Sequence, residues 1–247
     1  MQPTTRYSET RSHIAGATLW ASSHAQDVTT SILPDGCMDV IWSDGALIVS
    51  GPDLDRRQVT SAGEGHTIGL RLPPGLAPIL FRVSAADLTG RVVDLAALAG
   101  DGRARRLADA LAAEGAAGAD SRSSEPGAAL ERFVVDSLPT DLDDLFRSDP
   151  LLSVPRFLRS GMPVADVASA VGYSARQLQR KSLTAFGYGP KTLDAILRFQ
   201  QATSLLAVGT PLAATAAMAG YADQSHLSRA FTRFAGVGPS RWMTRAA

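Results

Sequence analysis

The chain has little cysteine and no long hydrophobic run, and each scarcity excludes a class of protein. Its single cysteine, Cys37, cannot form an internal disulfide, so a disulfide-stabilised scaffold is excluded and we expect a reducing, cytoplasmic environment. The purely apolar runs are short, as in Leu95 to Ala99, so we expect no membrane span and no membrane partner. Residues 1–21 carry several charged side chains and lack an apolar segment of signal-peptide type, so we expect no secretory signal.

Patterns typical of enzymes and metal sites are also scarce. Cys37, Asp39 and His66 fall in one expected sheet, but their spacing matches no nucleophile motif, and an isolated cysteine is most often a buried apolar residue. No His-x-His or CxxC spacing occurs, and the four histidines are scattered at His13, His24, His66 and His226. We therefore predict no enzymatic activity, no catalytic residue, no metal site and no cofactor.

The charge is balanced overall but not along the chain. The 247 residues include 24 Lys or Arg and 24 Asp or Glu, and 45% are hydrophobic, which predicts two domains with packed cores. Residues 151–247 hold eleven basic and three acidic side chains, a net charge of +8, whereas residues 1–150 have a net charge of −8. This asymmetry favours a polyanionic partner for the C-terminal part, with a chance split of surface charge as the alternative.

The first part of the chain has the pattern of strands and turns. Residues 37–42 and 46–49 are rich in β-forming side chains and flank Asp44-Gly45, which is typical of a hairpin. Residues 65–72 predict another strand, and residues 103–113 have helical spacing. We predict an α+β protein of two domains: a β-rich domain over residues 1–114, forming a small barrel or cradle, a linker over 115–127, and an all-α domain over 128–247.

The C-terminal part contains an internal repeat. Matching pairs lie 48 positions apart before the turn and 49 after it, so the second turn is one residue longer; they include Gly172/Gly220, Tyr173/Tyr221, Leu178/Leu227, Arg180/Arg229 and Gly187/Gly236.

Each copy has the pattern of a helix-turn-helix unit. A glycine able to take positive φ ends the first short helix, and Ser174 or Asp223 can cap the second. We place the first unit at about residues 163–187, a linker helix at about 190–206 and the second unit at about 211–236. The linker helix would set the separation of the two recognition helices, which should be about 34 Å to enter successive major grooves.

Residues 151–242 resemble the DNA-binding domain of the AraC/XylS family of bacterial transcription regulators. The match is carried by an aromatic residue after Gly220, the pattern Ser-x-Leu-x-Arg-x-Phe ending at Phe231, and Gly-x-x-Pro-x-x-aromatic ending at Trp242. The first unit departs from this pattern because Ser182 stands where the second has Phe231, with Leu183 beside it as a candidate to compensate. Two segments, Leu33-Pro34-Asp35-Gly36-Cys37-Met38-Asp39 and Arg71-Leu72-Pro73-Pro74-Gly75, carry a second match. Through them residues 30–113 resemble the N-terminal domain of an uncharacterised branch of these regulators.

The recognition helices supply the candidate contacts to DNA. Arg can donate two hydrogen bonds to guanine and Gln can pair with adenine. Lys and Arg side chains that contact DNA phosphates instead fix the register of the protein on the duplex. The base-reading candidates are Arg176, Gln179, Arg180, Gln224, Ser225, Ser228 and Arg229, and the phosphate candidates are Lys181, Arg233 and Arg241. Arg180 and Arg229 could equally contact phosphate, and all of these residues could be ordinary solvated side chains. In the N-terminal domain Trp20, Trp42 and Phe81 are candidates for a ligand pocket, with a role in the core as the alternative.

The sequence therefore predicts a sequence-specific transcription regulator whose N-terminal domain senses a small molecule or mediates dimerisation. A small-molecule-binding or catalytic N-terminal domain with an ancillary DNA-binding module is the second hypothesis, and a purely structural or protein-interaction role for the helical domain is the third. The expected partner is double-stranded DNA. A small-molecule effector, RNA polymerase for an activator, and a second copy of the chain are further candidates.

Overall fold

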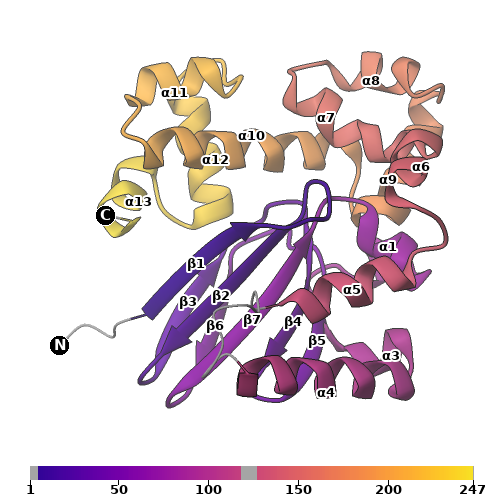
Figure 1. The fold of residues 1–247 in the computed structure, drawn as a ribbon. Coiled ribbons are helices and arrows are strands. Elements are labelled where there is room, and N and C mark those ends of the chain that lie inside the picture. Colours follow the sequence, from indigo (N-terminus) through magenta and orange to yellow (C-terminus); the bar gives the residue numbers. More distant parts are fainter. Residues whose placement is uncertain (1–4, 118–126, 247) are drawn as a thin grey trace.

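The computed structural model describes residues 5–117 and 127–246 and divides into a β-rich part and a helical part (Figure 1). The strands are β1 (Thr5–Arg11), β2 (Thr18–His24), β3 (Val28–Ile32), β4 (Met38–Ser43), β5 (Ala46–Ser50), β6 (Arg57–Ser61), β7 (Gly65–Leu72) and β8 (Val92–Asp94). Six of them form a sheet in the order β1-β2-β7-β4-β5-β8, and β3 pairs with β6 in a second sheet. The described strands form no closed barrel, so the β-rich part is an open sheet structure.

The expected hairpin is present between β4 and β5. Ser43 pairs with Ala46, and the two residues between them, Asp44 and Gly45, have φ values of 48° and 87°. Positive φ at both central positions is the geometry that Asp-Gly favours, since it matches the twist of the flanking strands. The predicted strand over residues 65–72 is β7, the strand that joins β2 to β4.

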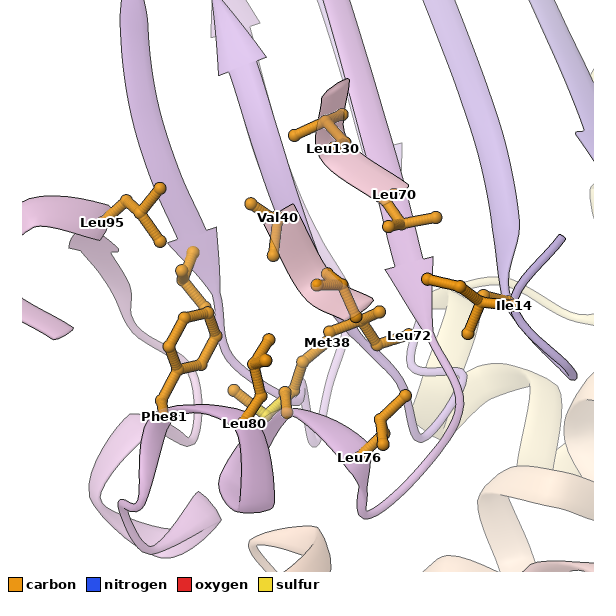
Figure 2. Close-up of a cluster of buried hydrophobic side chains, with 14 of the residues drawn as sticks. Ile14, Met38, Val40, Leu70, Leu72, Leu76, Leu80, Phe81, Leu95 and Leu130 are labelled. Carbon is orange, nitrogen blue, oxygen red and sulfur yellow. The ribbon is translucent and has the colours of Figure 1, made fainter. Parts of the chain in front are cut away.

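The large sheet buries one face under helices. One row of cross-strand partners points into the first hydrophobic core: Leu19, Leu70, Val40 and Val49. Figure 2 shows Leu70 and Val40 of this row. The helices of this part are α1 (Leu76–Phe81), α2 (Ala85–Leu88), α3 (Leu95–Ala99), α4 (Asp101–Ala117), α5 (Ala128–Ser137) and α6 (Leu142–Ser148), followed by the 3₁₀ turn η1 (Pro150–Ser153). The row of residues next along each strand points to the opposite face.

The two cores divide the chain later than the predicted start of the helical domain at residue 128. Ala129, Leu130 and Val134 of α5 pack in the first core, and so does Leu152, whereas the second core begins with Val154. Residues 118–126 of the predicted linker lie outside the described residues, and residues 115–117 belong to α4.

The second core holds two helix-turn-helix units joined by one long helix. Its helices are α7 (Val154–Arg159), α8 (Val164–Ala170), α9 (Ala175–Phe186), α10 (Pro190–Ala207), α11 (Leu212–Met218), α12 (Gln224–Ala235) and α13 (Pro239–Ala246). The first unit is α8 and α9, the second is α11 and α12, and α10 is the expected linker helix. The ring of Phe199 in α10 lies 5.0 Å from that of Phe231 and 5.2 Å from that of Phe234.

The β-rich part contacts the helical part at several points. Helix α9 packs against α1 and α2, and Thr89 Oγ1 donates a hydrogen bond of 3.3 Å to the carbonyl oxygen of Gly187. Gln200 Nε2 in α10 donates to the carbonyl oxygen of Pro34. In the described residues no helix is long and apolar enough to span a membrane.

Candidate nucleic-acid interface

The first recognition helix, α9, separates a buried face from a polar one. Ser174 and Gln177 form a reciprocal capping box at its start, so two backbone N–H groups that the helix leaves unpaired are bonded. Leu178 and Phe186 are buried, whereas the base-reading candidates are exposed: Arg176, Gln179 and Arg180. The helix therefore presents two guanidinium groups and one amide to solvent.

The second recognition helix, α12, repeats this arrangement. The side chain of Asp223 accepts a hydrogen bond of 2.6 Å from the backbone N–H of His226 and caps the helix. Leu227, Phe231 and Phe234 are buried, as expected. Of the candidate readers in this helix, Ser228 is half-buried and the others are exposed: Gln224, Ser225 and Arg229.

The glycines between the helices have the predicted conformation. Gly172 and Gly220 have φ values of 72° and 74°, in the left-handed region that favours glycine. Small side chains at Ala168 and Ala216 are buried where the helices of each unit meet.

The phosphate candidates lie in α9, α12 and α13. Arg233 and Arg241 are exposed, and the guanidinium of Arg233 stands 4.8 Å from the ring centroid of Phe234. Lys181 is half-buried, with its ammonium nitrogen 5.1 Å from the ring centroid of Tyr173. Such a cation over a ring is oriented while it keeps its charge available to an anion.

The two units differ where their sequences differ. Ser182 is 0% exposed at the position of Phe231, and Leu183 is 39% exposed. Leu183 therefore does not replace the missing ring. The Ser182 hydroxyl has no hydrogen-bond partner among the described residues.

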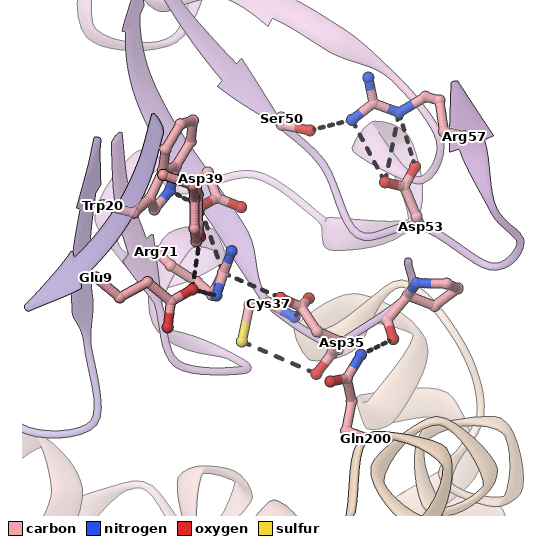
Figure 3. Close-up of polar contacts among 12 residues, drawn as sticks. Glu9, Trp20, Asp35, Cys37, Asp39, Ser50, Asp53, Arg57, Arg71 and Gln200 are labelled. Atoms are coloured by element: carbon pink, nitrogen blue, oxygen red, sulfur yellow. Dashed lines mark hydrogen bonds and ion pairs between the residues drawn. The ribbon is translucent and has the colours of Figure 1, made fainter. Parts of the chain in front are cut away.

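A second concentration of charge lies on the face of the large sheet opposite to the first core, next to Gln200 of α10 (Figure 3). This polar cluster is built around Arg71, whose guanidinium nitrogens lie 3.0 Å from Glu9 Oε1, 3.1 Å from Asp35 Oδ2 and 3.6 Å from Asp39 Oδ1. Asp39 and Arg71 are direct cross-strand partners in β4 and β7, so the sheet register brings them together. Trp20 Nε1 donates a hydrogen bond of 2.7 Å to Asp39 Oδ1.

Burial and crowding of like charges shift the titration of this cluster. Burial, together with the carboxyl of Asp35, raises the pKa of Asp39 to about 6, and burial also raises the pKa of Asp35. The pKa of the Cys37 thiol is raised by burial and then by the two carboxyl groups. Arg71 carries the opposing charge, and its own pKa is raised by Asp39 and Asp35 against the effect of burial.

The structure does not bring the three predicted ligand-binding aromatics together. Trp20 lies in the polar cluster, with its indole so close over Gly69 that a Cβ atom there would be 2.2 Å from the ring. Trp42 packs against the first core. Phe81 is buried in that core, on the face covered by helices (Figure 2). Cys37 lies beside Asp35 in the polar cluster, whereas His66 is exposed on β7. No group of three or more His, Cys, Asp or Glu side chains able to hold a metal occurs within residues 5–117 and 127–246.

Sequence reasoning missed Asp35, Arg71 and Tyr188. Tyr188, which follows α9, is buried, and a Cβ atom added at Gly36 would lie 3.6 Å from its hydroxyl oxygen. These residues are far apart in sequence and meet only through strand register and domain packing. Asp35 and Arg71 stand in the two segments that carry the N-terminal resemblance, but that resemblance assigned them no role.

Comparison with known proteins agrees with this geometry. Residues 167–245 match a family model described as a helix-turn-helix domain, and residues 15–94 match the domain of unknown function DUF6597. Over 126 residues the chain is 33% identical to the HTH-type transcriptional regulator RipA of Corynebacterium glutamicum, a match that covers 47% of this chain and about a third (35%) of the regulator.

Two solved structures share the fold over nearly the whole chain. One is apo ToxT of Vibrio cholerae in a lysine-to-alanine form (11% identity, 96% of this chain and 100% of that chain, TM-score 0.50). The other is ToxT of Vibrio cholerae O395 bound to (E)-4-(8-methylnaphthalen-1-yl)but-3-enoic acid (14% identity, 99% of each chain, TM-score 0.50). At these identities the likeness concerns the fold alone.

Proposed function

Because its C-terminal part is a helix-turn-helix domain of the AraC/XylS type, we propose that this chain is a sequence-specific DNA-binding transcription regulator. The carrying observation is the pair of capped recognition helices that both present Arg and Gln to solvent within a region of net charge +8. Two such helices joined by one rigid helix suit two successive major grooves of a duplex. The role is regulatory and not catalytic, and the site of action is the cytoplasm, where the chromosome lies.

We assign the contacts by residue type and place in each helix. Arg176, Gln179 and Arg180 read bases in the first half-site, and Gln224, Ser225, Ser228 and Arg229 read them in the second. Lys181, Arg233 and Arg241 contact phosphates and fix the register.

The test starts from genomic DNA pulled down by the full chain and sequenced to find an enriched site. Affinity for that site should fall with rising salt, with a log–log slope of about −0.9 for each phosphate contacted. Arg229→Ala should cost about 1–3 kcal/mol at one base pair and relax preference there, whereas Arg233→Ala should weaken binding to all sequences about equally. Arg105→Ala, an exposed arginine on α4, is the matched control and should bind as the unmodified chain does.

Absence of any enriched site, or an affinity independent of salt, would contradict the proposal. Uniform loss of affinity in both the Arg229 and Arg233 variants would contradict the division into base and phosphate contacts.

We propose further that the N-terminal domain controls DNA binding and that its polar cluster is the place where it senses a small polar molecule. Trp20 supplies an aromatic surface there, and Asp35, Asp39 and Arg71 supply both signs of charge on a partly exposed sheet face. A ligand can act only by binding two states of the protein with different affinity. We include in this proposal that the N-terminal domain mediates dimerisation, and that the chain contacts RNA polymerase if it is an activator.

A further inference from the structure

Strand β1 is an edge of the large sheet, and its outer side has no partner strand. It pairs with β2 on its inner side (Figure 1). Within residues 5–117 and 127–246, no backbone hydrogen bond joins its outer side to another segment. All seven side chains of β1 are exposed, so neither face of the strand is covered. A row of unpaired backbone N–H and C=O groups is a template for a further strand.

The register of the β1–β2 hairpin decides which backbone groups point outward. The backbone N–H of Ser12 donates a hydrogen bond of 3.3 Å to the carbonyl oxygen of Ala17, directly after the pair Arg11–Thr18. Hydrogen-bonded pairs alternate along an antiparallel ladder, so the even-numbered residues of β1 bond to β2. The odd-numbered residues therefore direct their N–H and C=O groups to the free edge: Thr5, Tyr7, Glu9 and Arg11.

This spacing suits pairing with a second copy of the same strand. Two antiparallel copies centred on Ser8 set residues 5, 7, 9 and 11 opposite residues 11, 9, 7 and 5, so every outward donor meets an outward acceptor. A register shifted by one residue would set outward-pointing groups against inward-pointing ones. A register shifted by two residues would leave one outward-pointing residue of each copy unpaired.

The charges on β1 agree with the same register. Charged side chains often protect an edge strand from pairing, and β1 carries Arg6, Glu9 and Arg11. Centred on Ser8, the pairing sets Arg6 opposite a threonine, Glu9 opposite a tyrosine and Arg11 opposite a threonine. No like charges are then directly opposite each other, which would be destabilising. Tyr7 is 51% exposed, so the pairing also covers apolar ring surface.

The other edge strands offer less. In the part of the chain that the structure describes, the opposite edge of the large sheet is β8, with three residues, and the second sheet consists of β3 and β6, with five residues each. Strand β1, with seven residues, is the longest edge strand described and makes the longest ladder.

We propose that two copies of this chain associate through β1, antiparallel and centred on Ser8, so that one sheet continues across a twofold axis. This inference rests on the dimerisation included in the proposed function, and it names the surface and the register. Ser8 then lies directly opposite Ser8 of the partner subunit as a non-hydrogen-bonded pair, with Cα atoms about 4.5 Å apart.

Exchange of charge at this central position tests the interface. The full chain is followed by sedimentation velocity over a series of concentrations, without DNA. Ser8→Lys and Ser8→Glu each set like charges opposite one another and should raise the dissociation constant of the dimer at least about tenfold. A fluorescently labelled Ser8→Lys chain mixed with Ser8→Glu should dimerise at least as tightly as the unmodified chain. Ser31→Lys, at an exposed serine of edge strand β3, is the matched control and should dimerise as the unmodified chain does.

Cross-linking tests the register. Ser8→Cys should form a disulfide between two copies under mild oxidation, because the expected Cα separation lies within the range of about 4.4–6.8 Å that a disulfide requires. Thr10→Cys, at an exposed position of the same strand, should not, because four residues along the strand separate it from its copy by about 13 Å. Non-reducing electrophoresis measures both products, and circular dichroism shows that each variant is folded.

The outcomes separate this inference from the proposed function. Dimers of Ser8→Lys as stable as those of the unmodified chain would overturn the β1 interface while leaving dimerisation through another surface. Equal cross-linking of Ser8→Cys and Thr10→Cys would overturn the register. An unmodified chain that is monomeric at every concentration would overturn both the β1 interface and the proposed dimerisation. DNA binding by the chain is read separately, from its affinity for the enriched site.

Discussion

Ser182 places a hydroxyl inside the second hydrophobic core without a hydrogen-bond partner among the described residues. A buried unsatisfied polar group costs about 1–3 kcal/mol. Ser182→Ala should therefore raise the free energy of unfolding by about 1 kcal/mol, measured by urea denaturation.

The control for this variant is Ser204→Ala, an exposed serine in α10 whose hydroxyl donates to the carbonyl oxygen of Gln200. Ser204→Ala measures the gain in helix propensity that any Ser to Ala change brings in a helix. An equal gain in both variants would show that the Ser182 hydroxyl is not destabilising.

The raised pKa of Asp39 makes the free energy of unfolding depend on pH. Its pKa is raised to about 6 in the folded chain, above the usual value for an aspartate, so between about pH 4 and pH 6 the folded state holds a proton that the unfolded state has lost. The free energy of unfolding should therefore fall as pH rises through this window. Asp39→Asn cannot ionise, keeps an oxygen to accept from Trp20, and should remove about 2 kcal/mol of that fall.

Urea denaturation at a series of pH values from 4 to 7 checks this expectation. Asp136→Asn, which changes an exposed aspartate on α5, is the matched control and should follow the unmodified chain. The same pH dependence in Asp39→Asn and in the unmodified chain would show that another group titrates.

At the scale of the elements, the sequence predicts best what local physics decides. The turn at Asp44-Gly45, the caps at Ser174 and Asp223, and the glycine conformations at Gly172 and Gly220 all follow from side-chain chemistry within a few residues. The repeat gives this local signal twice, once for α8 and α9 and once for α11 and α12.

What the sequence could not decide is which core an element joins. The apolar positions of α5 show that the helix is packed, but not that it packs on the β-rich domain. Strand β1 is exposed along its whole length and has no apolar alternation to reveal it. The polar cluster depends on the β4–β7 register, and Trp42 and Trp20 lie on opposite faces of the same sheet for the same reason.

At the scale of the whole molecule, the β-rich domain touches equivalent points of both DNA-binding units. Gly187 and Gly236 end the two recognition helices with φ values of 84° and 71°. A Cβ atom at Gly187 would lie 2.4 Å from Thr89 Oγ1 and 3.2 Å from the carbonyl oxygen of Ala85. A Cβ atom at Gly236 would lie 3.3 Å from Arg56 Nε, so the β-rich domain reaches both recognition helices at their ends.

These contacts imply that the β-rich domain fixes the separation of the two units. Gly187→Ala introduces a methyl group where Thr89 and the Ala85 carbonyl already stand, and should loosen the first unit from that domain. A preorganised pair of units binds one half-site spacing best, because it loses little freedom on binding. Gly187→Ala should therefore bind the enriched site more weakly than the unmodified chain does. When two base pairs are inserted between the half-sites, the affinity of Gly187→Ala should fall by a smaller factor than that of the unmodified chain.

The comparison that isolates the domain contact is Gly161→Ala, between α7 and α8. Gly161 has a φ of 82° but no atom within 4 Å of an added Cβ, so alanine there carries the same backbone strain, about 1–2 kcal/mol, without a clash. Fluorescence anisotropy on the native and the expanded sites measures both variants. If the DNA affinities of Gly161→Ala and Gly187→Ala change with half-site spacing in the same way, backbone strain accounts for the effect of both variants. The contact with the β-rich domain would then play no part, and α10 alone would set the separation of the units.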